Sequence, residues 1–450
     1  MGMKYHRNFY NFEIPYKNGA LLYNIVNRNF VFLNKEYYYL YQHLDLLEKD
    51  ENKHILNEFM DAEFILDNSV DERNAYLRNF YFSRWFSQKL LFTIVPTTAC
   101  NFRCPYCFEQ GIKFISMNTN IVKKSMEFIE ERIKTFKPED VSISFYGGEP
   151  LLALDKIVEF GMFFKRLGHI YNFKMNADVV TNGYLLSKEV ALELYNKARV
   201  RSAQITLDGP EEVHDARRFL SGGKPTFQRI YNNVKEVLMT GIEFVIRVRV
   251  NVDKTNIGHL EDLLAILSEL PERDNKLEVY FSPVTGESDK LQRHPDSTLF
   301  SEEEFGKVYV DKILPLLYKY DFDYERYPDL SYVFCGGITP YHYIIDSDGS
   351  IKKCYDLVGR KEESIGDVYN YRDDDKRVLK WELFEPLGDE CFNCKFLPIC
   401  GGGCPYKKMK SGKNVCEPWR YVLKDLLIKI YELKTSEEKR DEKTATGNNI

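Results

Sequence analysis

The sequence predicts an α/β protein: a TIM-like partial (β/α)6 barrel, with a winged-helix-like α+β module before it and a loop-rich region after it. Three observations support this prediction. Between residues 90 and 284, Val/Ile/Phe-rich segments alternate with amphipathic ones, as in parallel βα units. A strand-and-helix pattern precedes that repeat. The ten cysteines fall into two groups, within 100–107 and 335–416, whereas cysteines that only fill a core are scattered.

Composition narrows the class of protein. The 450 residues are 44% hydrophobic and 29% charged, which is typical of a folded protein of two to four units. A formal net charge of −6 gives no electrostatic reason to expect nucleic acid. No apolar run is long enough to span a membrane, and the first residues lack the apolar segment of a signal peptide. We therefore expect a cytoplasmic protein without a membrane partner.

Residues 1–88 are predicted to form the N-terminal module. A strand, a hairpin and three helical stretches are expected in that order, at residues 9–14, 21–33, 35–48, 51–62 and 72–87. The hairpin turn is Asn27-Arg28-Asn29, between two apolar strands. The alternative to an independent module is an extension that packs on the barrel.

Residues 89–284 are predicted to form the barrel. Its six strands are expected at residues 90–96, 141–146, 173–181, 202–208, 244–252 and 277–283. The helices between them are expected near residues 118–136, 154–167, 187–198, 225–240 and 257–269. Three polar motifs directly follow strands: the first cysteine group, Gly147-Gly148-Glu149-Pro150 and Thr181-Asn182-Gly183. Because the carboxyl ends of barrel strands form one working face, we expect these motifs to converge there.

Three further segments complete the predicted organisation. Residues 285–334 form a bridging region that is helical near 301–320. Residues 335–433 are rich in glycine and loops, and end in a helix at 421–433. This region has little apolar periodicity, so something other than a hydrophobic core must hold it. Residues 434–450 are expected to be a disordered, charged tail.

The first cysteine group has the spacing C-x3-C-x2-C, formed by Cys100, Cys104 and Cys107. Three thiolates can hold three corners of a [4Fe–4S] cluster and leave the fourth iron open to a small molecule. A partial zinc site is the alternative. Zinc prefers four ligands, however, and no histidine lies nearby in the sequence.

This motif resembles that of the radical SAM superfamily, which uses S-adenosylmethionine. The match includes the aromatic Tyr106 before the last cysteine and the Gly147-Gly148-Glu149-Pro150 motif one βα unit later. The resemblance implies that the reduced cluster splits S-adenosylmethionine, and that the resulting 5′-deoxyadenosyl radical abstracts a hydrogen atom from the substrate. It also implies that Gly147 and Gly148 let the backbone approach the methionyl group while Glu149 accepts a hydrogen bond from its amine.

Four further cofactor contacts follow from the same resemblance. Thr206, on the fourth barrel strand, is expected to contact the ribose, and Arg218 the carboxylate. Thr181 and Asn182 lie on the same predicted face. The alternatives are a surface salt bridge for Arg218 and an ordinary turn at a strand end for Thr181 and Asn182.

The second cysteine group resembles the SPASM domain, an extension of radical SAM enzymes that carries auxiliary clusters. The resemblance implies a distal cluster with four ligands, Cys391, Cys394, Cys400 and Cys416. It implies a proximal cluster with three, Cys335, Cys354 and Cys404. The ten cysteines would then serve three iron–sulfur clusters, all expected to be [4Fe–4S], with none left over. A zinc ribbon at Cys391 and Cys394 is the alternative.

The proximal cluster lacks a fourth cysteine ligand in this sequence. We expect its open iron to bind the thiolate of a substrate cysteine. Such an iron would lower the pKa of the thiol and hold its sulfur in position for bond formation. The alternative is that water or a nearby carboxylate, such as Asp356, fills the position.

Three functions compete for this chain. The first is a peptide maturase that forms a thioether from a cysteine sulfur to a carbon, of the sactipeptide or ranthipeptide kind. Its partners would be a cysteine-containing precursor peptide, whose leader adds a strand at residues 30–33, and a flavodoxin- or ferredoxin-like electron donor. The second is an anaerobic sulfatase-maturating enzyme that makes formylglycine, and the third is a non-catalytic electron carrier.

Two features favour the peptide maturase. In the sulfatase maturases an aspartate immediately follows the cysteine equivalent to Cys354, whereas this sequence has Tyr355 there and Asp356 one position later. Those enzymes also lack a preceding unit like residues 1–88. A mere electron carrier would need neither the open cluster nor the Gly-Gly-Glu-Pro motif.

Overall fold

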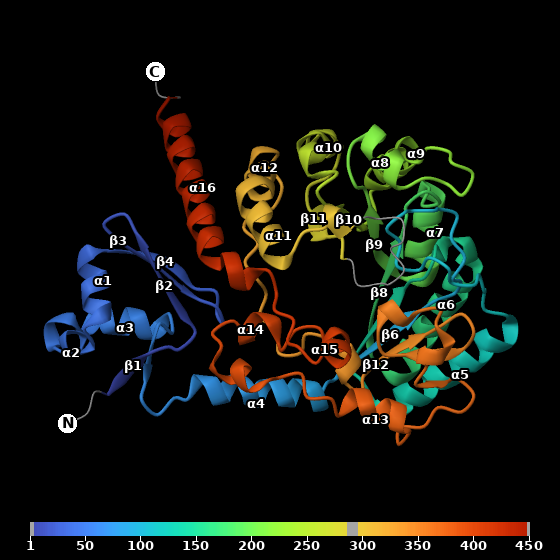
Figure 1. Ribbon diagram of the computed structural model, residues 1–450, viewed down its shortest axis with the longest axis horizontal. Helices are drawn as coiled ribbons and strands as arrows, with labels where there is room; N and C mark the ends of the chain where they lie inside the picture. The colour runs from blue at the N-terminus through green and yellow to red at the C-terminus, as the bar shows by residue number, and fades with distance from the viewer. Residues whose placement is uncertain (1–3, 286–295, 448–450) are drawn as a thin grey trace.

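The computed structural model describes residues 4–285 and 296–447. Its central feature is a nine-stranded sheet in the order β11-β10-β9-β8-β7-β6-β12-β13-β14 (Figure 1). Six of these strands pair in parallel, in chain order: β6 (Lys89–Ile94), β7 (Asp140–Phe145), β8 (Lys174–Thr181), β9 (Val200–Thr206), β10 (Val245–Val252) and β11 (Leu277–Pro283). The predicted α/β class and partial barrel are confirmed.

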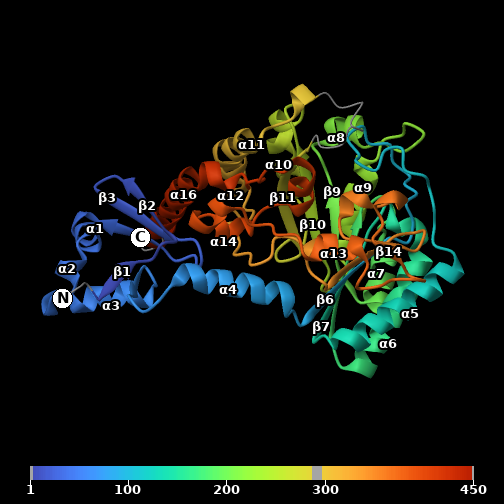
Figure 2. The ribbon, with the colours of Figure 1, turned by 60° about the horizontal axis from the view of Figure 1, so that its bottom comes forward.

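Helices follow these strands and cover the outside of the barrel (Figure 2). They are α5 (Thr119–Phe136), α6 (Leu154–Tyr171), α7 (Lys188–Ala198), α8 (Glu211–Arg217), α9 (Phe227–Leu238) and α10 (Leu260–Ser268). In α6, Ile157, Phe160, Phe164 and Leu167 recur every three or four residues and are buried. This spacing gives the helix one apolar face, which packs on the sheet. The short helix α8 was not among the predicted elements.

A strand from the cysteine-rich region extends the barrel sheet beyond β6. β12 (His342–Ile345) pairs in parallel with β6, and β13 (Ser350–Lys352) and β14 (Gly366–Asp367) follow in antiparallel pairing. The sequence predicted only loops here. A buried strand of four residues is too short to show an alternating pattern, so its pairing is decided by the tertiary structure.

The N-terminal module has its own antiparallel sheet and its own core. The sheet consists of β2 (Asn11–Tyr16), β3 (Gly19–Asn24) and β4 (Phe30–Asn34), as the predicted strand and hairpin require. One face packs on the helices α1 (Lys35–Gln42), α2 (Leu44–Leu47) and α3 (Lys53–Asp61). A short antiparallel pair, β1 (Tyr5–Arg7) with β5 (Ile65–Asp67), was not predicted.

The helix α4 (Glu72–Trp85) crosses from the N-terminal sheet to the barrel (Figures 1 and 2). Although it was predicted as the third helix of the module, it packs on the cysteine-rich region. The Tyr76 hydroxyl donates to the Leu397 carbonyl at 3.2 Å, and the buried Arg84 donates to the Glu382 carbonyl at 2.8 Å. α4 therefore belongs structurally to the segment that holds the second cysteine group.

The bridging region contains α11 (Glu302–Val308) and α12 (Leu314–Lys319), joined by one turn of π-helix, in line with the predicted helical stretch. Part of the predicted bridging region, residues 286–295, lies outside the described residues. The cysteine-rich region adds three short helices, α13 (Lys376–Glu382), α14 (Leu397–Cys400) and α15 (Pro405–Ser411). Within the described ranges, no helix combines the length and apolar character needed to cross a membrane.

The last helix, α16 (Trp419–Gly447), contacts α11 and covers the second face of the N-terminal sheet. The ring centroid of Tyr431 lies 5.5 Å from that of Tyr16, 6.1 Å from Phe30 and 5.9 Å from Phe32. The predicted disordered tail is therefore wrong for residues 434–447, which continue the helix. The first part of this helix, up to residue 433, was predicted, and its contacts with the distant sheet stabilise it; the continuation is too polar in sequence to indicate a helix. Residues 448–450 of the predicted tail lie outside the described residues.

Candidate active site

The first cysteine group lies in the loop after β6, at the carboxyl edge of the barrel. Cys100, Cys104 and Cys107 line one cavity of about 650 Å³, together with Thr98 and Gly148. Cys104 is buried and the other two are half-buried. Burial raises the pKa of the Cys100 and Cys107 thiols to about 12. The predicted convergence of the three thiols with the glycine loop is thus present in the structure.

The loop after β7 packs against the backbone that leads into the cysteine loop. A Cβ atom at Gly147 would lie 2.4 Å from the Thr97 carbonyl oxygen, and one at Gly148 would lie 2.5 Å from the Ala99 carbonyl oxygen. The Glu149 amide donates to that Ala99 oxygen at 2.8 Å. Only glycine permits this contact, because any side chain would force the two loops apart.

The Glu149 carboxylate is fully buried and joins the loops after β7 and β8. It accepts hydrogen bonds from the Leu151 amide at 3.0 Å, the Thr181 hydroxyl at 2.7 Å and the Asn182 amide at 2.7 Å. Burial raises the pKa of Glu149, and these hydrogen bonds oppose the rise. The oxygens of Glu149 therefore hold the β8 loop in place, and its predicted contact with the methionyl amine stays a prediction.

Asn182 extends this connection to the cysteine loop. Its side-chain amide donates to Asn101 Oδ1 at 2.8 Å, and Asn101 follows Cys100 directly. Thr181 and Asn182 are therefore more than an ordinary turn at a strand end. Together with Glu149 they fix the relative positions of the loops after β6, β7 and β8.

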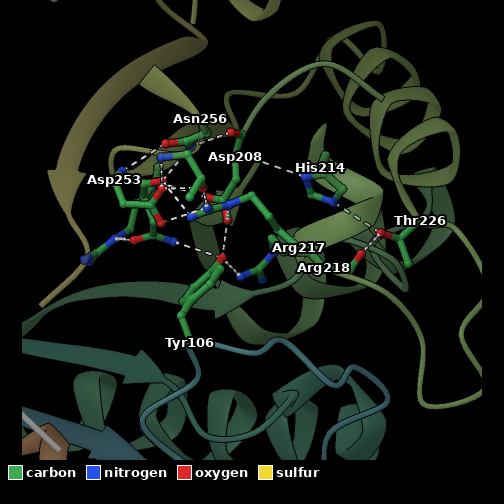
Figure 3. A network of polar contacts seen from close by, with 11 residues as sticks. Tyr106, Asp208, His214, Arg217, Arg218, Thr226, Asp253 and Asn256 are labelled. Atoms are coloured by element: carbon green, nitrogen blue, oxygen red, sulfur yellow. Dashed lines mark hydrogen bonds and ion pairs between the residues drawn. The ribbon is translucent and has the colours of Figure 1, made fainter. Parts of the chain in front are cut away.

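A second polar network anchors Tyr106, which precedes the last cysteine of the group (Figure 3). Its hydroxyl donates to Asp208 Oδ2 and accepts from Arg218 Nη1 at 2.8 Å. Arg217 reaches the same Asp208 oxygen at 3.5 Å and forms an ion pair with Asp253 at 2.7 Å. Because Asp208 and Asp253 follow β9 and β10, this network ties the cysteine loop to the far side of the barrel face.

Arg218 and Thr206, the remaining predicted cofactor contacts, occupy different surroundings. Arg218 faces the interior beside Tyr106, and its Nε atom is buried without a hydrogen-bond partner among the described residues. The surface salt bridge proposed as its alternative is therefore wrong. Thr206 is buried at the end of β9, opposite Arg249 of β10.

Four cysteines of the second group line a smaller cavity of about 70 Å³, namely Cys391, Cys394, Cys400 and Cys416. Arg420 lines the same cavity, and its Nη1 atom donates to Cys416 Sγ at 3.1 Å. This is the set of four thiols that the SPASM resemblance assigned to one cluster. All ten cysteines of the chain are free thiols, so no disulfide competes for them.

The other three thiols of the second group belong to Cys335, Cys354 and Cys404. Burial raises the pKa of each, and the Asp356 carboxylate adds to the rise at all three. Asp356 thus lies close to this set of thiols. Beside it, the Tyr355 hydroxyl accepts from Thr93 Oγ1 on β6 at 3.1 Å, and its ring packs edge-on against Tyr146.

Comparison with known proteins identifies the central part of the chain. Residues 94–267, which carry the cysteine loop, the glycine loop and the Tyr106 network, match the family model of the radical SAM superfamily. This is a radical SAM domain. The chain is accordingly a radical SAM enzyme, and members of that superfamily use a [4Fe–4S] cluster and S-adenosylmethionine.

Individual relatives resemble the chain over longer ranges. The cysteine-type anaerobic sulfatase-maturating enzyme of Clostridium novyi is 25% identical over 388 residues, which cover 77% of this chain and 98% of that protein. The structure of anSMEcpe with bound AdoMet aligns with a TM-score of 0.56 and 18% identity, over 77% of this chain and 98% of that one. Streptococcus suis SuiB bound to the precursor peptide SuiA aligns with a TM-score of 0.50 and 16% identity, over 92% and 98%. Both structures share the fold of this chain.

The radical SAM site fits its cofactors by the chemistry of its lining. Three thiols face one cavity, and two buried polar atoms near it, Arg218 Nε and Glu109 Oε1, have no hydrogen-bond partner among the described residues. A zwitterionic ligand, such as the methionyl group of S-adenosylmethionine, would supply hydrogen-bond partners for both atoms. Across the described ranges, no three His, Cys, Asp or Glu side chains form a site for a single metal ion.

Several residues of the radical SAM site were missed by sequence reasoning. They are Asn101, Glu109, Asp208, Arg217 and Asp253. Asp253 directly follows β10 and Asp208 lies two residues after β9, at the carboxyl edge where Thr181 and Asn182 also lie. Glu109 lines the cysteine cavity, and burial beside Asp346 raises its pKa to about 8. No feature of the sequence distinguishes it from a surface glutamate.

Proposed function

We propose that this radical SAM enzyme modifies a ribosomally made precursor peptide and forms a thioether between a cysteine sulfur and a carbon. The observation that carries the proposal is the N-terminal sheet, which has one open edge. In the β2-β3-β4 order, β2 and β4 are the edge strands. An open edge can accept an extended peptide as an additional strand.

The two edges of the N-terminal sheet differ in their capacity for a peptide. β2 carries Pro15, which has no amide hydrogen, and Lys395 Nζ donates to the Asn11 carbonyl at 2.8 Å. These features obstruct the β2 edge. β4 contains no proline, pairs only with β3 among the described residues, and exposes Val31 at 37%. We therefore assign the leader peptide to β4, at residues 30–34.

The likeness to SuiB supports this assignment. Residues 89–450 are four-fifths of the chain, so an alignment over 92% of it extends into the N-terminal module. The SuiB structure contains its precursor peptide SuiA. The likeness to anSMEcpe covers 77% of the chain, although related anSMEcpe structures contain the Kp18Cys and Cp18Cys peptides.

In this proposal Cys100, Cys104 and Cys107 hold the cluster of the radical SAM domain. When bound, that cluster supplies one electron to S-adenosylmethionine, which yields the radical that abstracts a hydrogen atom from the peptide. The two glycines of the β7 loop allow close approach of the methionyl group, and Arg218 pairs with its carboxylate. Glu149 fixes the loops around it, and the Tyr106 network fixes the cysteine loop.

The second cysteine group would hold two auxiliary clusters. The cavity lined by four thiols suits a fully ligated cluster, and Arg420 stabilises the thiolate of Cys416. At Cys335, Cys354 and Cys404, the thiolate of the substrate cysteine would be the fourth ligand when the peptide binds. The carboxylate of Asp356, which follows Cys354 by two residues, is the alternative fourth ligand.

Sulfatase maturation is the second candidate function. The observation in its favour is the 25% identity to the Clostridium novyi enzyme, which extends over 98% of that protein. Against it stands Tyr355, which occupies the position where the resemblance calls for an aspartate. Its hydroxyl accepts a hydrogen bond from Thr93 on β6, and the residue is 40% exposed; a tyrosine there cannot supply the carboxylate of an aspartate.

Peptide binding by the N-terminal sheet tests the proposal. Val31→Lys places a charge at the docking edge, so the dissociation constant for a cysteine-bearing precursor peptide should rise about tenfold. Val70→Lys, at another exposed valine of the module, is the matched control and should bind as the wild type does. Fluorescence anisotropy measures the affinity, and thermal melting checks that both variants fold.

Mass spectrometry of the products separates the two candidate functions. A thioether leaves the peptide lighter by two hydrogen atoms and blocks alkylation of the cysteine. Formylglycine instead replaces the cysteine sulfur by oxygen and removes two hydrogen atoms, so its mass change differs from that of a thioether. Conversion of a sulfatase peptide to formylglycine, with no change in the precursor peptide, would contradict the proposal.

A further inference from the structure

The segment from Cys404 to Lys424 is strongly basic in an acidic protein. It contains one carboxylate, Glu417, and six cations, Lys407, Lys408, Lys410, Lys413, Arg420 and Lys424, whereas the whole chain has a net charge of −6. The segment spans α15 and the first turns of α16. We define the basic surface as its four exposed cations, Lys410, Lys413, Arg420 and Lys424.

The basic surface lies against the cavity lined by four thiols. Asn414, Val415, Cys416 and Arg420 line that cavity, so this segment forms one of its walls. Arg420 is exposed and also donates to Cys416 Sγ at 3.1 Å, so one surface cation contacts a ligand thiol directly. On the inner side, the positive charge of Lys408 acts on Cys391.

Carboxylates neutralise this surface only in part. Lys410, Lys413 and Lys424 form no ion pair with any carboxylate that the structure describes. Lys410 lies over the ring of Tyr406, at 4.6 Å. Four acidic groups lie nearby: Glu390 accepts from Asn414, Glu417 is half-buried beside Glu302 and Lys407, the charge of Glu363 acts on Lys410, and Asp425 is exposed beside Lys424. The segment nevertheless carries more cations than carboxylates, so a positive field remains for an external partner.

We propose that the basic surface is the docking site of an acidic one-electron carrier protein of the ferredoxin class. The inference rests on the proposed function in one respect, that Cys391, Cys394, Cys400 and Cys416 hold a cluster. In the encounter the reduced carrier loses one electron and that cluster gains one. No bond forms or breaks and no proton is required. The electron then serves the radical SAM site.

Two physical arguments favour this partner. The rate of electron transfer falls steeply with distance, so a carrier must dock beside a cluster near the surface. The wall formed by residues 414–420 provides such a place. Complexes of electron carriers are small and short-lived, and opposite charges govern their formation more than apolar contact does. A cluster of exposed cations beside a thiol-lined cavity meets both requirements. The leader peptide is assigned to a different part of the chain, the β4 edge of the N-terminal module.

Direct binding of a carrier to the reconstituted holoenzyme tests the proposal. The probe is a plant-type [2Fe–2S] ferredoxin with a strongly negative net charge. The basic-surface variant is Lys410→Gln/Lys413→Gln/Lys424→Gln. The matched control is Lys123→Gln/Lys188→Gln/Lys235→Gln, which removes the same charge from exposed positions on the outside of the barrel. Interferometry at low and raised salt measures the dissociation constant.

We expect the basic-surface variant to bind ferredoxin about tenfold more weakly than the wild type, with a smaller salt dependence. The control variant should match the wild type. Lys410→Arg/Lys413→Arg/Lys424→Arg should retain affinity, which separates charge from folding. Stopped-flow absorbance should show slower cluster reduction by ferredoxin in the Gln variant, and equal rates with dithionite, which needs no docking site.

Three results would overturn the proposal: no binding of ferredoxin to the wild type, equal weakening in the basic-surface and control variants, or weakened binding of the precursor peptide with unchanged binding of ferredoxin. The last result would assign the surface to the peptide. Failure of the proposed function is distinguishable, because it appears as the absence of a modified peptide and leaves the ferredoxin affinity unchanged.

Discussion

Glu149 is a buried carboxylate whose position depends on its three hydrogen bonds. A buried carboxylate that loses a hydrogen-bond donor has no water to replace it, and the unsatisfied oxygen costs about 1–3 kcal/mol. Thr181→Val removes the hydroxyl donor while it keeps the shape of the side chain. We expect this variant to unfold at lower urea concentration, by about 1–3 kcal/mol, and to bind S-adenosylmethionine several-fold more weakly.

The control for this prediction is Thr135→Val. The hydroxyl of Thr135 bonds to the Glu131 carbonyl on the exposed side of α5, away from the site. Urea titration and isothermal titration calorimetry measure the two effects. If the two variants behaved alike, Glu149 would not organise the cofactor loops.

The burial of His214 should make the free energy of unfolding depend on pH. It is fully buried, and burial together with Arg218 and Arg217 holds its pKa well below the ordinary value. Nδ1 accepts from the Asp208 amide at 3.3 Å, so the ring proton is on Nε2, which lies 3.1 Å from the Thr226 hydroxyl (Figure 3). The folded protein therefore keeps this histidine neutral, while the unfolded chain protonates it below about pH 6.5.

Because the unfolded state binds the additional proton, stability falls as the pH drops below about 6.5 and continues to fall toward the lower pKa of the folded state. His214→Gln should flatten this dependence between pH 7.5 and about 5. Urea midpoints measured across that range test it, with the exposed His54→Gln as the control. An unchanged slope in the His214 variant would show that other groups determine the acid sensitivity.

Residues with distinctive chemistry could be predicted at this site, whereas residues that act through their neighbours could not. The cysteines and glycines were identifiable because ligation and close backbone approach permit few residue types. Asp208 and Arg217 are common residue types, and their roles arise from side chains that meet across β9 and β10. Glu149 was found by its motif, but its partners came only from the structure.

At the scale of elements, α16 stabilises the N-terminal sheet through Tyr431. This ring contacts three aromatic side chains of β2 and β4. Tyr431→Ala should therefore weaken the sheet by about 2 kcal/mol, and hydrogen exchange at residues 11–34 should accelerate more than in the barrel. Tyr421→Ala, at an exposed tyrosine of the same helix, should leave exchange unchanged. Uniform acceleration throughout the chain would contradict this local role.

Elements with a strong pattern of their own were predicted well, as the six barrel strands and the helix α6 show. Three elements were not. β12 is too short to show a period. α16 was predicted only as far as residue 433, and it packs on a sheet more than 380 residues earlier in the sequence. α4 was predicted as a helix, but its packing partners lie in the cysteine-rich region. In each case distant contacts outweigh local preference.

For the whole molecule, the ten cysteines predict how much iron the chain binds. Anaerobic reconstitution should yield about twelve irons per chain if three [4Fe–4S] clusters form. Replacement of Cys100, Cys104 and Cys107 by alanine should leave about eight irons and abolish cleavage of S-adenosylmethionine. Iron analysis and chromatography of the cleavage product measure these effects.

The matched variant for the auxiliary region is Cys391→Ala/Cys394→Ala. It should lose about four irons and still cleave S-adenosylmethionine, because the thiols of the radical SAM domain remain. If cleavage persisted in the first triple variant, the assignment of the open cluster to Cys100, Cys104 and Cys107 would be wrong.

The pairing of β12 with β6 has a consequence for biosynthesis. About 250 residues separate these neighbouring strands, and loop closure over such a distance is slow. While the nascent chain emerges from the ribosome, β6 has no partner on that side until residue 345 has been made. The edge beside the cysteine loop therefore stays exposed for most of translation. Truncation before residue 342 should therefore produce an aggregation-prone protein.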